Sequence, residues 1–253
     1  MDIYAQAMAL AVFALLAGAA LIAMRFSSRL PAHHRSEDTA LIVRHIANVF
    51  VVMTSLVFGL MINSAKDTFE TIDKSMHAFA TELILLDRSL RSYGQDGTDA
   101  RKALIMYVEV AIQSPARTSD GPHYEIGPAE RSLNAIGDAL GRILPDNGLQ
   151  ASLLVDARQQ FHRIVERRWS IVEQSEGVLP MPMVYILIAW LTLIFASFGF
   201  RAPQNAIVIA AFLSGALLIS AAFYFVLDMD IPFSGAIEVS DAPLRRALAE
   251  LKL

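Results

Sequence analysis

The stretch of sequence that decides the fold is residues 44–90, which read RHIANVFVVMTSLVFGLMINSAKDTFETIDKSMHAFATELILLDRSL. After Arg44 and His45 it is an uncharged apolar run, and from Lys66 it continues as a charged segment that keeps a regular apolar pattern. Apolar residues recur at alternating spacings of four and three: Phe58, Ile62, Ala65, Phe69, Ile72, Met76, Phe79, Leu83, Leu86 and Leu90. A period of about 3.5 residues is typical of a helix whose seam packs in a coiled coil or bundle. The stretch therefore predicts one continuous helix from about Thr39 to Arg91, which crosses a membrane and continues beyond it.

The composition around this stretch is that of a membrane protein. Of 253 residues, 55% are hydrophobic and 18% are charged, whereas soluble domains carry about 25% charged residues. A membrane-spanning helix needs about 20 apolar residues. Four uncharged runs reach that length, at residues 3–24, 46–65, 177–200 and 202–227. The first run has no basic residue before it, so we interpret it as a retained helix and not as a secretory signal.

Composition also excludes several kinds of chemistry. The chain has no cysteine, which excludes disulfides, thiolate nucleophiles and cysteine-ligated metals. A net charge of −4 gives no reason to expect nucleic acid as a partner. We find no phosphate-binding glycine loop, metalloprotease motif or nucleophile elbow. The sequence therefore does not favour an enzyme.

The polar middle of the chain, residues 66–176, is helical in pattern. Its breakers are Gly94, the segment 114–128 and the turn 145–148, and no run alternates as a strand would. The last piece carries a second apolar seam, interrupted only by Arg168: Leu154, Ala157, Phe161, Ile164, Arg168 and Ile171. We predict an all-α membrane protein in which this bundle is inserted between the second and third spans. Its parts are residues 1–65, 66–176, 177–227 and 228–253.

One face of the second span combines charge, polarity and apolar bulk. Extending the seam backwards gives, in order, Arg44, Asn48, Val51, Ser55, Phe58 and Ile62. If copies of this helix surround an axis, the face makes a basic mouth, two hydrogen-bonding rings and an apolar constriction, which are the elements of a gated anion path. Alternatively, Asn48 and Ser55 bond neighbouring helices while Arg44 extends to lipid headgroups. The sequence leaves both interpretations open.

A motif at the end of the last span carries a family resemblance. Residues 227–244 read LDMDIPFSGAIEVSDAPL. This segment resembles the closing motif of the bestrophin-like family of four-span membrane proteins, in which acidic residues precede Pro-Phe-x-Gly and a Pro-Leu pair follows. The matching residues are Asp228, Asp230, Pro232, Phe233 and Gly235. The chain departs from the family's pattern in having no tryptophan soon after the second span.

The resemblance implies a fold similar to bestrophins, which are homo-oligomeric, usually pentameric, anion channels with a pore lined by the second helix. It implies a multi-pass protein in a lipid bilayer, in a bacterial inner membrane, with an anion as the permeant species. By similarity, calcium is a candidate cofactor, and its candidate ligands are Asp228, Asp230, Glu238 and Asp241, since calcium prefers several oxygen ligands. In the alternative interpretation the first two of these residues cap the end of the span while Phe233 anchors the loop.

Two questions stay open at the level of sequence. Basic residues in the linker between the first two spans favour a cytoplasmic linker, whereas the resemblance favours the opposite orientation. The second question is function, because a membrane-anchored sensor or scaffold that binds a ligand or partner through residues 66–176 also fits the pattern.

Overall fold

The structure is a computed structural model of the chain. It describes residues 2–27, 37–113, 127–175, 177, 179–200, 202–231, 233 and 236–253. The chain separates into two compact units. Unit 1 comprises Met1–Thr68 and Gly177–Ile237, and unit 2 comprises Phe69–Glu176 and Glu238–Leu253.

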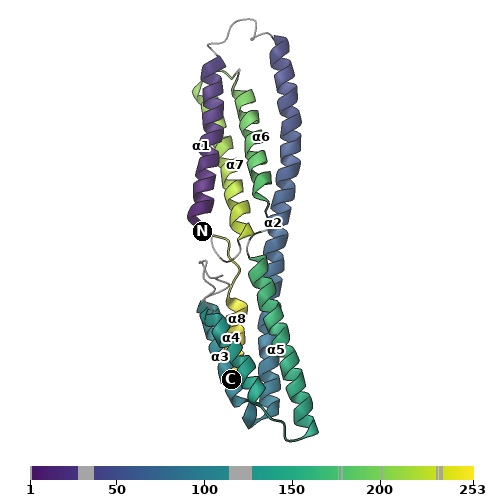
Figure 1. Ribbon diagram of the computed structural model, residues 1–253. Coiled ribbons are helices and arrows are strands. Elements are labelled where there is room, and N and C mark those ends of the chain that lie inside the picture. The colour runs from purple at the N-terminus through teal and green to yellow at the C-terminus, as the bar shows by residue number, and fades with distance from the viewer. Residues whose placement is uncertain are drawn as a thin grey trace. The chain divides into compact units, whose positions relative to one another are not determined.

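Unit 1 contains the helices that are long and apolar enough to span a membrane. They are α1 (Asp2–Ser27), the first part of α2 (Glu37–Tyr93), α6 (Met181–Gly199) and α7 (Ala206–Asp230), drawn together in Figure 1. Helices α6 and α7 both pack against α1, and Leu16, Leu187 and Phe223 are fully buried where the helices meet. The four predicted spans are confirmed for the part of the chain that the structure describes.

A glycine permits the close approach of α1 and α6. Gly199, at the end of α6, is buried, and a Cβ atom placed on it would collide with the carbonyl oxygen of Ala20 on α1. Any larger residue must therefore push the two helices apart. By contrast, a Cβ at Gly18 on α1 would meet no atom within 4 Å.

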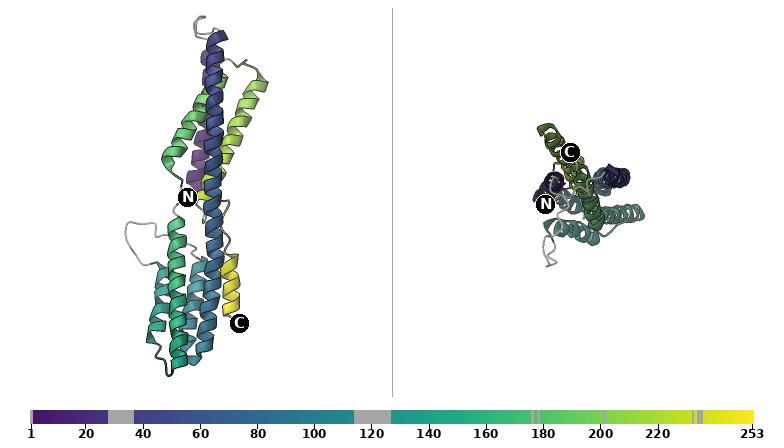
Figure 2. Two further views of the ribbon diagram at one scale, coloured as in Figure 1. Left: turned by 90° about the vertical axis from the view of Figure 1, so that its right-hand side faces the viewer. Right: turned by 90° about the horizontal axis from the view of Figure 1, so that it is seen from above.

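Unit 2 is a helical bundle. The second part of α2 is joined by a short 3-10 turn, η2 (Gln95–Gly97), to α3 (Thr98–Gln113), and α4 (Pro128–Arg142), α5 (Gly148–Gln174) and α8 (Ala242–Leu251) complete it. Figure 2 shows these helices from two further directions. The described residues contain no strand, so the all-α prediction is confirmed.

Local sequence explains where several helices begin. Pro128 is the first residue of α4, a position at which proline's missing amide hydrogen costs nothing. Asn147 precedes α5, and its side-chain oxygen accepts a hydrogen bond of 2.9 Å from the amide of Gln150. Asn205 does the same for α7 with the amide of Val208, at 2.8 Å. Such caps satisfy amides that the first turn of a helix leaves unpaired.

The long helix is confirmed. Helix α2 has 57 residues and extends from Glu37 to Tyr93, two residues further at each end than predicted. Its apolar seam is buried from Ile72 to Leu90 in unit 2, where the ring of Phe79 contacts that of Tyr107 on α3. In unit 1 the buried stripe of α2 is displaced from the predicted seam to Ala47, Thr54 and Met61. Both lipid and protein accept apolar side chains, so a hydropathy pattern cannot show which face of a membrane helix contacts protein.

Candidate functional site

The face of α2 singled out in the sequence lies on the surface of unit 1. Arg44, Asn48 and Ser55 are exposed, as are Val51 and Ile62, at 38% and 42% of their surface. The helix places these residues on one side because spacings of three and four return to the same face. The structure therefore leaves five of the six face residues without cover from their own unit.

Phe58 is the exception on this face. It is half-buried, and its ring centroid lies 5.1 Å from that of Phe223 on α7, with the rings tilted by 47°. Two turns earlier on α2, the ring of Phe50 contacts that of Trp190 on α6, with the centroids 6.3 Å apart. Aromatic pairs of this geometry stabilise helix packing beyond their buried area. These two contacts fix the rotation of α2 against its own unit.

The opposite end of the membrane helices carries two buried carboxylates. Asp228 is 3% exposed and accepts a hydrogen bond of 2.8 Å from the amide of Ile237. Asp230 is 4% exposed and accepts the amide of Leu179 at 3.2 and 3.4 Å through its two oxygens. In one interpretation of the sequence these carboxylates cap the end of the span. Each accepts an amide outside α7, one in the segment after it and one just before α6.

The segment before α6 is shaped to approach Asp230. Gly177 adopts φ of +85°, a left-handed backbone conformation that favours glycine. A Cβ at this position would lie 2.8 Å from a carboxylate oxygen of Asp230. Glycine is therefore required here both by backbone conformation and by space.

The other residues of the family motif are only partly covered by the structure. Pro232 and Gly235 lie outside the described residues, and Phe233 is half-buried. The predicted calcium ligands Asp228, Asp230, Glu238 and Asp241 do not form a recognised site, since no group of three or more acidic or histidine side chains lies together among the described residues. Asp241 pairs with Arg245 at 2.6 Å, and this arginine lowers the pKa of the Asp241 carboxyl below its usual range. Calcium binding stays a prediction.

A buried ion cluster in unit 2 was not predicted. Asp87 is 2% exposed and accepts hydrogen bonds of 2.6 Å from both Arg91 and Arg101. Arg101 also donates to the carbonyl of Leu251 at 3.0 Å, and Arg91 donates to the carbonyls of Glu250 and Leu251 at 3.0 and 3.3 Å. These carbonyls lie in the last turn of α8, where no further turn supplies amides, and that of Glu250 also accepts the amide of Leu253 at 3.3 Å. The cluster therefore holds the last turn of α8 to α2 and α3.

Two further ion pairs join helices of unit 2. Glu82 on α2 accepts a hydrogen bond of 2.9 Å from Arg167 on α5. Glu109 on α3 pairs with Lys252, the residue after α8, at 2.6 Å. Arg168 is half-buried and lies near the hydroxyl of the fully buried Tyr107, where its charge opposes the effect of burial on the tyrosine pKa.

The chain is similar to known proteins in both sequence and fold. Residues 14–244 match the family described as the bestrophin-like domain. A comparison with curated proteins gives no match. The fold is similar to crystal structures of two single-substitution variants of a bacterial bestrophin homologue from Klebsiella pneumoniae. The first has a TM-score of 0.70 and 12% identity over 96% of this chain and 97% of that one. The second has a TM-score of 0.65 and 12% identity over 95% and 96%.

Proposed function

Because the chain belongs to the bestrophin-like family, we propose that it is a homo-oligomeric ion channel that conducts anions through a pore lined by α2. The chain is an integral membrane protein with the bestrophin fold. The pore, the permeant anion and a pentameric ring are the proposed steps beyond this.

The observation that carries the proposal is the exposure of polar side chains on a membrane helix. Asn48 and Ser55 lie within the apolar part of α2 and are exposed on unit 1. A polar group facing lipid costs free energy, so such residues usually face protein or a water-filled path. A ring of subunits with α2 at its axis gives both residues water or a neighbouring copy to bind.

The order of residues along the face supports an anion path. Arg44 stands at one end and gives a ring of positive charge that concentrates anions and repels cations. Val51, Phe58 and Ile62 follow, and apolar rings of this kind can close a pore by excluding water. The contact of Phe58 with Phe223 would hold the side chains that form one of these apolar rings at a defined position around the pore. The face thus combines a selecting element with a closing element.

Flux measurements in vesicles test the proposal. Wild-type protein reconstituted into chloride-loaded vesicles should release chloride, and Arg44→Glu should reduce this flux and lower the preference for anions over cations. Lys74→Glu is the matched control, because Lys74 lies on the same helix but in unit 2 and is 77% exposed. It should leave flux unchanged.

The oligomeric state in mild detergent decides between this function and its alternative. A ring with α2 at its axis requires several copies, so a monomer would contradict the channel. A stoichiometric partner protein together with absent flux would instead favour the membrane-anchored scaffold that binds through residues 66–176.

A further inference from the structure

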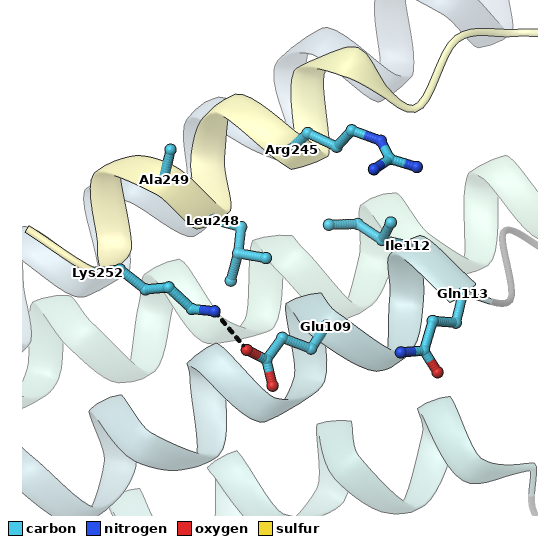
Figure 3. A pocket seen from close by; sticks show the side chains of 7 residues that line it. All are labelled: Glu109, Ile112, Gln113, Arg245, Leu248, Ala249 and Lys252. Atoms are coloured by element: carbon cyan, nitrogen blue, oxygen red, sulfur yellow. Dashed lines mark ion pairs between the residues drawn. The ribbon is translucent and has the colours of Figure 1, made fainter.

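Unit 2 carries an open groove between α3 and α8, apart from the proposed pore face (Figure 3). Its volume is about 600 Å³, within the range of about 300–1,000 Å³ that is typical of small-molecule sites. Helix α3 contributes Glu109, Ile112 and Gln113 to it. Residues of α8 form the other wall.

Two cations stand along the α8 wall. Arg245 and Lys252 lie about two helical turns apart, which is roughly 10 Å along the helix axis. Between them lie Leu248 from α8 and Ile112 from α3, and Figure 3 shows the carboxylate of Glu109 on the facing wall near Lys252. The site therefore offers positive charge at both ends, two apolar side chains between them and one competing carboxylate.

Both cations retain donors that their present partners do not use. Lys252 Nζ binds Glu109 Oε1 at 2.6 Å, which engages one of three ammonium hydrogens. Arg245 binds Asp241 Oδ2 through Nε at 2.8 Å and Nη2 at 2.6 Å, which leaves its Nη1 hydrogens for another acceptor. Acceptor oxygens of a ligand can therefore bind at each end without breaking either ion pair.

The wall that bears these cations is held in place from behind. Leu244, Ala247 and Leu251 are buried on the other face of α8. The carbonyl of Leu251 accepts the hydrogen bond from Arg101. A wall fixed in this way loses little conformational freedom on binding, which favours affinity.

We propose that this groove is a binding site for short aliphatic dicarboxylates. One carboxylate binds the free side of the Arg245 guanidinium and the other binds the Lys252 ammonium. The methylene chain lies over Leu248 and Ile112. Glu109 competes for Lys252, and so it limits affinity.

Calorimetric titration of the full chain in detergent with adipate tests the site. Wild-type protein should show saturable binding. Arg245→Gln and Lys252→Gln should each weaken it about tenfold or more, because each removes a charge-assisted hydrogen bond. Arg246→Gln is the matched control: it removes the same charge from the same helix, but Arg246 bonds its own helix at Ala242 and does not line the groove. The control should bind adipate as wild type does.

Two further measurements separate a dicarboxylate from other occupants. Glu109→Gln should tighten adipate binding, since the isosteric amide removes the competing charge, whereas a site for cationic ligands would be lost. Butyrate, with one carboxylate, should bind more weakly than adipate. Absent saturation with the wild-type protein, equal weakening by Arg246→Gln, or weakening by Glu109→Gln would each overturn the proposal. None of these readouts depends on ion flux, so the groove and the channel succeed or fail separately.

Discussion

Asp87 on α2 and Arg101 on α3 are joined by a hydrogen bond of 2.6 Å between Oδ1 and Nε, and the aspartate side chain is only 2% exposed. A carboxylate this deeply buried must be paired to be tolerated. The pair is completed by Arg91 on the other oxygen and by the terminal carbonyls of α8. One carboxylate thus orients two guanidinium groups that hold a third helix.

Replacing Asp87 should destabilise unit 2. Asp87→Ala leaves two arginines facing each other without their shared anion, and we expect the free energy of unfolding to fall by about 2–4 kcal/mol. Thermal unfolding in detergent measures this change. The control is Asp99→Ala, whose carboxylate is 83% exposed and 3.4 Å from Lys102, and which should leave the melting temperature unchanged. Equal effects of the two substitutions would contradict the role of the buried cluster.

Gly199→Ala should weaken the packing of α1 against α6. Its Cβ collides with backbone at Ala20, which cannot move aside as a flexible side chain would, and overpacking of this kind costs about 1–3 kcal/mol. The melting temperature in detergent should fall. Gly18→Ala, whose Cβ meets open space, should not lower it, and a Gly199→Ala protein as stable as wild type would show that the helices separate easily.

The carboxylate of Asp228 should stabilise the segment after α7 without calcium. Asp228→Ala removes a partly buried hydrogen bond from the amide of Ile237 to a carboxylate, which should lower the free energy of unfolding by about 1–3 kcal/mol. The melting temperature should fall equally in calcium and in a chelator. A fall that occurs only in calcium would instead identify Asp228 as a metal ligand.

The hydroxyl of Tyr107 should make the stability of unit 2 depend on pH in the alkaline range. Burial raises the pKa of Tyr107 above 10.0, and the charge of Arg168 acts in the opposite direction. The unfolded chain therefore releases this proton first, so the contribution of Tyr107 to stability is full below pH 10 and declines above it. Tyr107→Phe should remove that decline.

The same substitution tests the cost of the buried hydroxyl. Arg168 lies beside this oxygen, but the oxygen makes no hydrogen bond of good geometry with the described residues, so removing it should not lower the melting temperature at neutral pH. A clear fall would show that the hydroxyl makes a stabilising hydrogen bond.

The apolar part of the proposed pore face should control conductance. Ile62→Ser makes a closing ring polar and should raise chloride flux in vesicles, because a wetted constriction no longer excludes water. Leu60→Ser is the matched control, since Leu60 is also exposed on α2, at 60%, but points to another side of the helix. If both substitutions raise flux equally, the effect is not specific to the face.

Helices were predictable from the sequence because their signals are local. The span lengths, Pro128, Asn147 and the seam of unit 2 all act within a few residues of where they appear. The ion pairs were less predictable. Asp87 and Arg91 have the helical spacing of four, but the third partner, Arg101, depends on how α3 packs against α2. Likewise, Glu82 selects Arg167 over its neighbour Arg168 by the rotation of α5, which adjacent positions in a sequence do not reveal.

The candidate pore face was predictable as a pattern but not as a pore. The structure leaves it uncovered, yet the ring that would enclose it involves other copies of the chain.

Unit 2 is assembled from two parts of the chain that are synthesised far apart in time. Its first part, Phe69–Glu176, emerges from the ribosome before α6 and α7, and Glu238–Leu253 emerges after them. Because chains fold largely in the order of synthesis, the arginines that await the carbonyls of α8 stay incompletely bonded until the last two membrane helices have been made. Unit 2 can therefore be completed only after α6 and α7 have been made. A chain whose last two membrane helices fail to insert would keep an incomplete bundle, which proteases cleave more readily.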